Sequence, residues 1–542
     1  MSAQRSEFFR QLKKNSFDLL VIGGGVTGAG IALDAAARGL KTALVEKRDF
    51  ASGTSSKSTK LIHGGLRYLK QFEIGLVREV GRERAIVHRL APHLVKSEKM
   101  LLPIIRGGTY NMLASSFGLW LYDFLAGVRG NDRRRMLTRQ QALQHEPLLR
   151  KEDLMGGGLY AEYRTDDARL TIENIKTAVR HGAVCVNYAK AGHFLYQKGR
   201  IAGCTVTDHF TGEQTEVKAS WIVNAAGPWV DDLRRIDHSV KGKHLFLSKG
   251  VHIVVPAERL PLRQAVYFDV PGGRMLFAIP RQRATYIGTT DTAFEGDPNQ
   301  VFAQKDEVEY LLAGANAMFP GAGLTLNDVE SSWAGLRPLI YEEGKSPGEM
   351  SRKDEIFISI SGLISIAGGK LTGYRKMAER VVNLVSEQLK KELGRTTGPC
   401  LTAKIPLSSM PFKDAGEVSI FQESLLKRTR SMQLPDHYAV YLCENYGRDA
   451  NSIIEKVNSA EVPAELSLLE NELTYCLEHE FVMKPADFFE RRTGRLYFNL
   501  PSVREHLDFV LGIFQRKFAW EEGRFRQEKN AMLALIDHVS RF

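Results

Sequence analysis

The sequence predicts an α/β domain built on a parallel sheet, a second α+β domain built on an antiparallel sheet, and an all-α C-terminal domain. Three observations predict this order. A glycine-rich turn joins a strand to a helix near residue 23, short alternating apolar segments fill residues 245–290, and apolar residues fall at helical spacing beyond residue 412. The chain has 542 residues, enough for several packed domains of about 100–200 residues each.

Composition excludes several classes of protein. The net charge of +11 suits an anionic substrate, an anionic membrane surface or nucleic acid, and does not choose among them. The five cysteines form no C-x-x-C pair, so neither a disulfide framework nor a metal site is predicted, and a reducing cytosol fits. The N-terminus lacks a signal peptide's apolar core, and no stretch reaches the roughly 20 apolar residues of a spanning helix. Any membrane contact is therefore expected to be peripheral.

The first element of the α/β domain is a strand–turn–helix unit. An apolar run at 17–22 predicts a strand, residues 26–38 a helix, and residues 42–45 a second strand. Gly23, Gly25 and Gly28 between them match the dinucleotide fingerprint, in which glycines permit a tight turn, close approach of a pyrophosphate, and close helix packing. The helix N-terminus offers N–H groups to phosphates, and Glu46 offers acceptors to a ribose. This pattern alone does not separate FAD from NAD.

Two later turns favour FAD. Residues 221–226 (WIVNAA) predict a strand that ends at Gly227, and the Gly368–Gly369–Lys370 turn precedes a helix predicted from Leu371. Three such turns over about 350 residues indicate a discontinuous nucleotide-binding domain. Such a domain encloses a long, tightly held cofactor better than a dissociating one.

Apolar helices next to basic residues raise the question of a membrane surface. Residues 110–127 are unusually apolar, and Arg129, Arg133, Arg134 and Arg135 follow them. A helix of this kind lies on an anionic membrane or packs in a core or subunit contact. The N-terminal Phe8, Phe9 and Leu12, with three basic neighbours, pose the same alternatives.

The remaining elements follow in order. Short alternating segments at 252–255, 265–268, 275–280 and 285–288 predict an antiparallel sheet. From about residue 394 turn-forming residues indicate a linker, and residues 412–542 are predicted to form a helical domain.

Five motifs carry a resemblance to a known family. They are GTSSKSTKLIHGGLRYL (53–69), IGTTDT (287–292), WAGLRPL (333–339), AGGKLTGYRKMAE (367–379) and PADFFERRTGR (485–495). With them the chain resembles the aerobic bacterial FAD-dependent glycerol-3-phosphate dehydrogenases over nearly its whole length. The resemblance implies a Rossmann-like FAD-binding domain of the glycine-oxidase type, formed by residues 17–105, 165–235 and 335–393. It further implies a substrate domain at 106–164 and 236–334, and the helical domain at 412–542.

The same resemblance implies a function and partners. Such enzymes oxidise sn-glycerol 3-phosphate to dihydroxyacetone phosphate and reduce a membrane quinone at the cytoplasmic face of the cell membrane. We therefore expect FAD as cofactor, glycerol 3-phosphate, quinone and an anionic membrane surface as partners, no nucleic acid, and a homodimer as one compatible state. Oxidase relatives that form hydrogen peroxide are usually longer through an insertion not seen here, which favours the dehydrogenase.

Site residues follow from the motifs and the resemblance together. The residues expected to bind FAD are Gly23, Gly25, Thr27, Gly28, Glu46, Thr54, Ser55, Thr59, Leu61, His63, Gly227, Gly369, Lys370, Leu371 and Thr372. Those expected to bind substrate are Arg67, Tyr68, His252, Asp291, Arg337, Arg352 and Lys370. His252, Arg337 and Lys370 are expected to be catalytic.

The chemistry explains these residue types. An arginine fork matches phosphate oxygens, and Lys370 can bind phosphate or stabilise negative charge on the reduced flavin. Oxidation removes the alcohol proton and transfers a hydride to the flavin, so a base with a pKa near neutrality is needed. His252 is the favoured base, with His63 as the alternative. Asp291 is expected to orient substrate or the flavin ribityl chain, or to close an Asx turn.

Three other functions remain open from the residues. An oxidase would give peroxide under air. An amino-acid oxidase of the same fold would need one carboxylate-binding arginine rather than several cations. A flavin-bound scaffold would dock partners through its helical C-terminal domain and would not turn over substrate.

Overall fold

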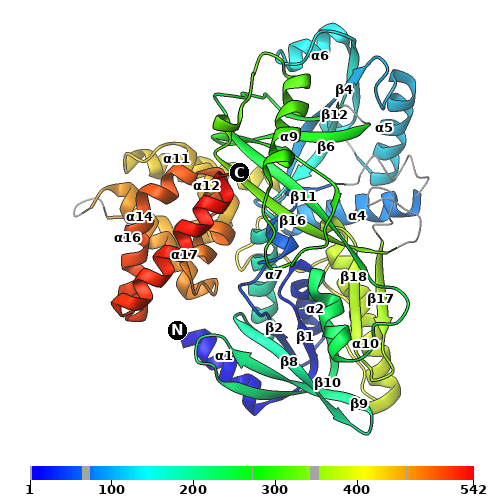
Figure 1. Cartoon of the computed structure of the whole chain (residues 1–542), viewed down its shortest axis with the longest axis vertical. Coiled ribbons are helices and arrows are strands. Elements are labelled where there is room, and N and C mark those ends of the chain that lie inside the picture. Colours follow the sequence, from blue (N-terminus) through cyan, green and yellow to red (C-terminus); the bar gives the residue numbers. More distant parts are fainter. Residues whose placement is uncertain (1–2, 64–73, 129, 271–272, 342–352, 459–461) are drawn as a thin grey trace.

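The computed structural model describes residues 3–63, 74–128, 130–270, 273–341, 353–458 and 462–542. Figure 1 shows one sheet in the lower part of the molecule, a second sheet above it, and the C-terminal helices packed at the left. No helix in the described parts of the chain has both the length and the apolar content that a bilayer crossing requires.

The lower sheet has the parallel centre that the glycine turn predicts. Its path runs β17-β18-β10-β1-β2-β7, with β8 and β9 continuing from β10. β1 lies between β10 and β2 and is parallel to both, which confirms that the strand predicted at 221–226 closes on the first strand. The strands are β1 (Ser16–Ile22), β2 (Thr42–Val45), β7 (Val184–Val186), β8 (Ala189–Gln197), β9 (Arg200–Asp208), β10 (Gln214–Asn224), β17 (Asp354–Ile358) and β18 (Ile364–Gly368).

Both faces of this sheet are buried, as its continuous apolar strands require. Leu19 and Val21 of β1 face the helices α2 (Val26–Ala37), α7 (Asp167–Arg180) and α10 (Tyr374–Leu393). The alternate residues of β1 face α1 (Ala3–Lys14) and the β8–β9 hairpin. Phe9 and Leu12 of α1 are buried on this face, so the N-terminal helix packs in the core and its apolar side does not meet a membrane.

The upper sheet is largely antiparallel, as the alternating segments predict. Its path runs β15-β11-β14-β13-β12-β4-β6-β3, with β16 paired to β11 and β5 to β6. Only the β12–β4 pair is parallel among the pairings described for it. The strands are β3 (Leu61–Ile62), β4 (Lys96–Ile105), β5 (Arg135–Thr138), β6 (Leu154–Arg164), β11 (Leu245–Pro256), β12 (Ala265–Val270), β13 (Arg274–Arg281), β14 (Ala284–Gly288), β15 (Thr292–Ala293) and β16 (Ser331–Ile340). The helices α5 (Met112–Ala126), α6 (Arg139–His145) and α9 (Lys305–Met318) accompany this sheet. The helix α8 (Val230–Ile236) contacts β18 of the lower sheet, and the end of α4 (Ile74–Leu90) packs in the core of the lower sheet.

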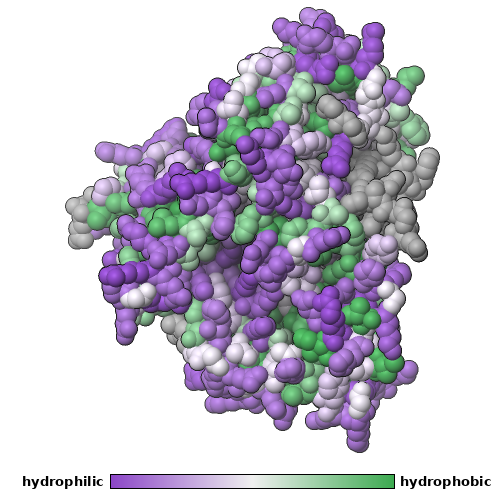
Figure 2. Space-filling model, viewed as in Figure 1, coloured by the Kyte–Doolittle hydropathy of each residue, from purple (hydrophilic) through white to green (hydrophobic). Residues whose placement is uncertain are grey.

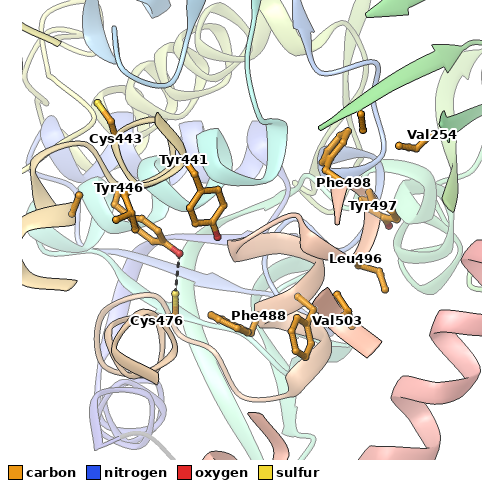
Figure 3. Close-up of a cluster of buried hydrophobic side chains, with 14 of the residues drawn as sticks. Val254, Tyr441, Cys443, Tyr446, Cys476, Phe488, Leu496, Tyr497, Phe498 and Val503 are labelled. Atoms are coloured by element: carbon orange, nitrogen blue, oxygen red, sulfur yellow. Dashed lines mark hydrogen bonds between the residues drawn. The ribbon is translucent and has the colours of Figure 1, made fainter. Parts of the chain in front are cut away.

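The C-terminal region is helical, as predicted. Gly394 ends α10 in the left-handed conformation, and residues 395–414 contain no helix or strand. The helices are α11 (Ala415–Ser431), α12 (His437–Tyr446), α13 (Ala450–Ile454), α14 (Ala464–His479), α15 (Arg495–Phe498), α16 (Leu500–Phe518) and α17 (Glu522–Ser540), with a π-helical turn η7 (Asp487–Arg492). Figure 3 shows their core, where the Tyr446 hydroxyl lies 3.6 Å from the Cys476 sulfur and Phe498 lies on the side of Val254 from the upper sheet. One apolar cluster thus joins the helical domain to the upper sheet.

Candidate active site

A cavity of about 530 Å³ opens where the central strands of the lower sheet end. Ile22 of β1, Val45 of β2 and Ala225 after β10 line one end of it, and residues of β11 and β16 of the upper sheet line the other. Ligands of open parallel sheets bind at the carboxyl ends of the strands. Its volume lies within the usual range for cofactor sites, roughly 300–1,000 Å³.

The glycine turn at the start of α2 admits no side chain. Gly23 has φ +116°, and a Cβ on it would lie 2.5 Å from the Ala225 carbonyl oxygen. A Cβ on Gly28 would lie 1.9 Å from the Gly23 carbonyl oxygen. Gly25 caps α2 in an extended conformation, and residue 25 itself places no side chain over the first N–H groups of the helix. Gly23 and Gly28 thus have the tight turn and the close packing that their spacing predicts, and the approach of a pyrophosphate at Gly25 stays a prediction.

Residues after β2 hold this turn in place. The Glu46 carboxylate accepts hydrogen bonds from the backbone N–H of Gly24 at 2.7 Å and of Arg48 at 2.9 Å. Burial raises the pKa of Glu46, and these two N–H groups oppose that rise. The Ser55 hydroxyl accepts from the Val26 N–H at 2.9 Å, which leaves one fewer N–H at the helix start for a ligand. Glu46 also lines the cavity, so it can still accept from a ribose.

The turn after β18 forms another wall. Gly368 and Gly369 have φ of +79° and +80°, and a Cβ on Gly369 would lie 2.5 Å from the Met377 sulfur. Lys370 then caps a short 3-10 turn, η5 (Leu371–Gly373), and α10 follows from Tyr374. The helix predicted from Leu371 thus begins as this tighter turn. The Thr372 hydroxyl both accepts from the His63 N–H and donates to the His63 carbonyl, each at 3.1 Å, so this wall is joined to the end of β3.

Arg337 supplies the cationic end of the cavity. It lies on β16 directly opposite Ser248 of β11. Its guanidinium donates to the Thr289 hydroxyl at 3.0 Å and to the Thr290 carbonyl at 3.2 Å, and pairs with Asp291 at 3.4 Å. Asp291 also accepts from the Ser248 hydroxyl, so its part in the site is to hold the arginine.

The arginine lies flat above a glycine. A Cβ on Gly250 of β11 would meet the Arg337 guanidinium at 2.3 Å. Gly250 and Arg337 both line the cavity, and the side chain of Arg337 is about one-fifth exposed. The guanidinium is therefore fixed in one orientation and still reaches the cavity, as a phosphate-binding group must.

His252 lies next to this arginine with a neutral ring. Its Nε2 lies 3.0 Å from the Thr59 hydroxyl, and its ring stacks on Trp333 with centroids 4.8 Å apart. Its Nδ1 is buried and has no hydrogen-bond partner among the described residues. Burial, then the charges of Arg337 and Lys60, hold the pKa of His252 well below its ordinary value. A neutral imidazole can accept a proton, although a pKa held this low makes it a weaker base than one near neutrality.

The cavity brings together most of the residues predicted from the sequence. Those that line it are Gly23, Gly25, Thr27, Glu46, Thr54, Ser55, Thr59, Leu61, His63, Gly227, His252, Arg337, Gly369, Lys370, Leu371 and Thr372. Gly28 packs behind the turn and Asp291 behind Arg337. Arg67, Tyr68 and Arg352 lie outside the described residues.

Some residues of the cavity were not predicted. Trp229 follows the Gly227–Pro228 turn and lies 3.8 Å below the Lys47 ammonium, and both residues line the cavity beside Glu46. Burial lowers the pKa of Lys47 to about 8. Lys57 also lines the cavity, and burial lowers its pKa. Trp229, Lys47 and Lys57 lie close in sequence to residues predicted to bind FAD, and this nearness is the signal that could have identified them.

Comparison with known proteins places this geometry in a family. Residues 18–375 match the family of FAD dependent oxidoreductases, and residues 400–525 match the C-terminal domain of alpha-glycerophosphate oxidase. The aerobic glycerol-3-phosphate dehydrogenase of Bacillus subtilis is 50% identical over 528 residues, which are 96% of this chain and 95% of that protein. The chain belongs to the family of aerobic glycerol-3-phosphate dehydrogenases.

Solved structures agree with this family membership. The crystal structure of the glycerol-3-phosphate dehydrogenase from Bacillus halodurans complexed with FAD has 43% identity and a TM-score of 0.84, and the match covers 99% of this chain and 98% of that one. Glycine oxidase from Bacillus cereus, at 20% identity and a TM-score of 0.51 over 69% of this chain, shares the fold of the oxidoreductase part. The predicted fold class and its glycine-oxidase type are thereby confirmed.

The cavity fits the FAD of this family. Its floor is a glycine cradle that a single Cβ would fill, and its two ends carry the acceptors of Glu46 and the cations of Arg337 and Lys370. A helix N-terminus with its N–H groups lies between these ends, where a pyrophosphate is expected. The dehydrogenase is therefore FAD-dependent, and its own residues provide the binding, orientation and electrostatics while the cofactor supplies the redox chemistry.

Proposed function

We propose that this protein oxidises sn-glycerol 3-phosphate to dihydroxyacetone phosphate and passes the electrons through FAD to a membrane quinone. The observation that carries the proposal is that three groups of suitable chemistry line one cavity. They are the guanidinium of Arg337, the neutral buried imidazole of His252 and the Lys370 ammonium. Cations suit a phosphate dianion, and a neutral imidazole suits removal of an alcohol proton.

Arg337 is proposed to bind the substrate phosphate. Its contacts with Thr289, Thr290 and Asp291 fix the plane of the guanidinium before substrate arrives. A fixed fork loses little side-chain entropy on binding and accepts phosphate oxygens in pairs. An alcohol without a phosphate would leave this cation unpaired in a confined site, which costs binding free energy.

His252 is proposed to take the proton from the substrate hydroxyl. Stacking on Trp333 and the contact with Thr59 fix the ring in one plane, so a substrate held by Arg337 meets the imidazole in a defined orientation. When bound, FAD would accept the hydride from the substrate carbon. Lys370, at the start of η5, is proposed to stabilise negative charge that develops beside it.

The membrane is proposed to meet α5. One side of this helix packs inward through Leu119 and Tyr122, which are buried. The other side carries an exposed apolar row, which consists of Leu113 (85% exposed), Phe117 (64%), Trp120 (50%) and Phe124 (72%). Exposed Arg133 and Arg135 follow the helix. Figure 2 shows apolar surface at the upper right, where Figure 1 places α5. An apolar row beside arginines suits the interface of an anionic bilayer, in line with a peripheral enzyme at the inner face of the cell membrane.

Vesicle binding tests this surface. Holoenzyme is mixed with phosphatidylglycerol-containing and with purely zwitterionic vesicles, and bound protein is measured by sedimentation. The account expects binding to the anionic vesicles and its loss in Trp120→Ser, with Ile420→Ser, an exposed apolar residue of α11, as the control. If Trp120→Ser instead changes the oligomeric state and leaves vesicle binding intact, the face is a contact between copies in a homodimer and the membrane proposal is wrong.

An anaerobic assay tests the reaction. The holoenzyme is mixed with glycerol 3-phosphate, and oxidised-flavin absorbance and dihydroxyacetone phosphate are followed before and after a quinone analogue is added. We expect substrate to bleach the flavin and the quinone to restore it. Bleaching that only oxygen reverses, with stoichiometric peroxide, would identify an oxidase instead, and no bleaching would refute the proposal.

A further inference from the structure

The C-terminal domain contacts a segment beside the cofactor cavity through a motif that does not itself line the cavity. The PADFFERRTGR segment forms η7 and the start of α15. Phe488 points into the core of the C-terminal domain in Figure 3 and is fully buried. Arg491 and Arg492, later in the same π-helical turn, are also buried but reach the other way, into the lower sheet. π-Helical turns are rare and occur frequently at functional sites.

Both arginines converge on one carboxylate of the FAD-binding part. Arg492 donates to both oxygens of Asp49, at 2.7 and 2.9 Å, and the Arg491 Nε donates at 2.7 Å. The Asn187 amide donates a fourth hydrogen bond at 3.0 Å. Asp49 and Arg492 are both 0% exposed. The arginine charges hold the pKa of Asp49 below its usual range, against the effect of burial, so the carboxylate stays ionised.

Asp49 begins the segment that forms a wall of the cavity. Ser52 to Ser55 and Lys57 line the cavity directly. Ala51, two residues after Asp49, donates its N–H to the Gly24 carbonyl at 3.0 Å, and the Ser55 hydroxyl accepts from the Val26 N–H in the first turn of α2. The segment at 49–55 is therefore joined to the phosphate-binding turn by two hydrogen bonds.

A second path between the two domains runs through aromatic rings. Phe481 lies between α14 and η7, and its ring meets the edge of the Phe50 ring with centroids 5.5 Å apart. Phe50 is fully buried, and a Cβ on Gly24 would lie 2.6 Å from its ring. Phe481 thus supports the phosphate-binding turn through a single intervening side chain.

We infer that the C-terminal domain is part of the cofactor site, with Arg491 and Arg492 as positioning residues that hold FAD through Asp49. Arg491 also pairs with Asp487 and Glu490 of its own turn, whereas the described ion pair of Arg492 is with Asp49. A buried ion pair adds little net stability compared with apolar residues of the same size, so stability alone does not account for the buried arginines at Asp49. Position accounts for them, because the pair fixes the segment that orders the phosphate-binding turn.

The test measures FAD affinity in the full-length protein. Apoprotein of Arg492→Lys and of Asp49→Asn is titrated with FAD, and flavin fluorescence quenching gives the dissociation constant. Either change removes charge-assisted hydrogen bonds to the segment, so we expect the dissociation constant to rise roughly 10- to 100-fold. The control is Arg495→Lys, since Arg495 is also buried (6% exposed) and pairs with Glu472 inside the C-terminal domain alone.

Thermal unfolding separates positioning from a merely structural role. All three variants are expected to unfold at a lower temperature as apoproteins. The rise in unfolding temperature that saturating FAD gives the native protein should be retained in Arg495→Lys and reduced in Arg492→Lys and Asp49→Asn. An unchanged FAD dissociation constant in the last two, with a lower apoprotein unfolding temperature, would overturn the inference.

A milder substitution keeps the test decisive if those variants do not fold. Phe481→Leu removes no charge and reduces the contact of the C-terminal domain with the Phe50 ring, which packs beside Gly24. We expect weaker FAD binding in a protein with native far-ultraviolet circular dichroism. Native FAD affinity in this variant would count against the coupling between the two domains.

Discussion

Replacement of Arg337 by methionine tests the phosphate site most sharply. Methionine keeps much of the side-chain volume and removes the guanidinium. A hydrogen bond to a charged group contributes about 1.5–3 kcal/mol. Two such bonds to phosphate therefore amount to roughly 3–6 kcal/mol, which corresponds to a loss of about 10²- to 10⁴-fold in kcat/KM for glycerol 3-phosphate. Asp291 would also lose its arginine contact and repel the phosphate, which places the loss toward the upper end.

The assay compares phosphorylated and unphosphorylated substrate. Flavin reduction is followed anaerobically with glycerol 3-phosphate and with glycerol, at measured FAD occupancy, in the native protein, in Arg337→Met and in Arg337→Lys. The lysine variant keeps a charge but not the fork and should lose less than the methionine variant. Since glycerol has no phosphate, its rate should change little. A proportional loss for both substrates would refute the phosphate role of Arg337.

Three further predictions follow from the geometry. Gly28→Ala should abolish stable FAD binding because its Cβ would lie 1.9 Å from the Gly23 carbonyl oxygen. The control is Gly523→Ala, which has open space around it and should keep FAD. If Gly28→Ala retains FAD on gel filtration, the prediction is wrong. His93 is buried with a pKa of about 3, so the unfolded chain takes up a proton below about pH 6.5 that the folded chain does not, and the free energy of unfolding should fall by about 1.4 kcal/mol per pH unit from this residue. In His93→Asn the free energy of unfolding, measured by denaturant titration between pH 6.5 and 5, should fall less steeply with pH. If the slope against pH is unchanged, His93 does not contribute to it and the prediction is wrong. The double variant Phe117→Ser with Phe124→Ser should bind anionic vesicles roughly 10-fold more weakly or worse, since each buried phenylalanine contributes about 1.5–3 kcal/mol; equal binding would exclude α5.

Local sequence determined what could be predicted of the fold. The strand at Thr42–Val45 has the predicted bounds, and the glycine turn has the predicted conformation, because both depend on neighbours in the chain. The alternating segments also predicted β11 to β14 correctly. The domain bounds given for residues 17–393 stay a prediction.

Contacts between distant segments could not be predicted from local pattern. Ser248 faces Arg337 only through the register of β11 with β16, which are separated by more than 70 residues. The same register stacks His252 on Trp333, and this stack fixes the plane of the imidazole. Asp291 contacts Arg337 in the folded chain, and no turn pattern around Asp291 predicts that contact.

Local sequence also failed to predict the exposed side of α5 and the shared partner of the two arginines of η7. The apolar sequence at 110–127 was compatible with a core helix or a surface helix, and only packing shows that Phe117 and Phe124 face outward. Arg491 and Arg492 belong to a recognisable motif, but their shared partner Asp49 lies more than 400 residues earlier in the chain.

The most direct test of the central claim is stopped-flow reduction of the bound flavin without oxygen, with glycerol 3-phosphate and glycerol at equal concentration. The claim is that the cationic end of the cavity selects a phosphorylated alcohol beside the cofactor. It predicts fast bleaching with glycerol 3-phosphate, saturable in substrate, and reduction by glycerol slower by at least about 100-fold, given the loss of the phosphate contacts. Equal rates for the two alcohols would contradict it.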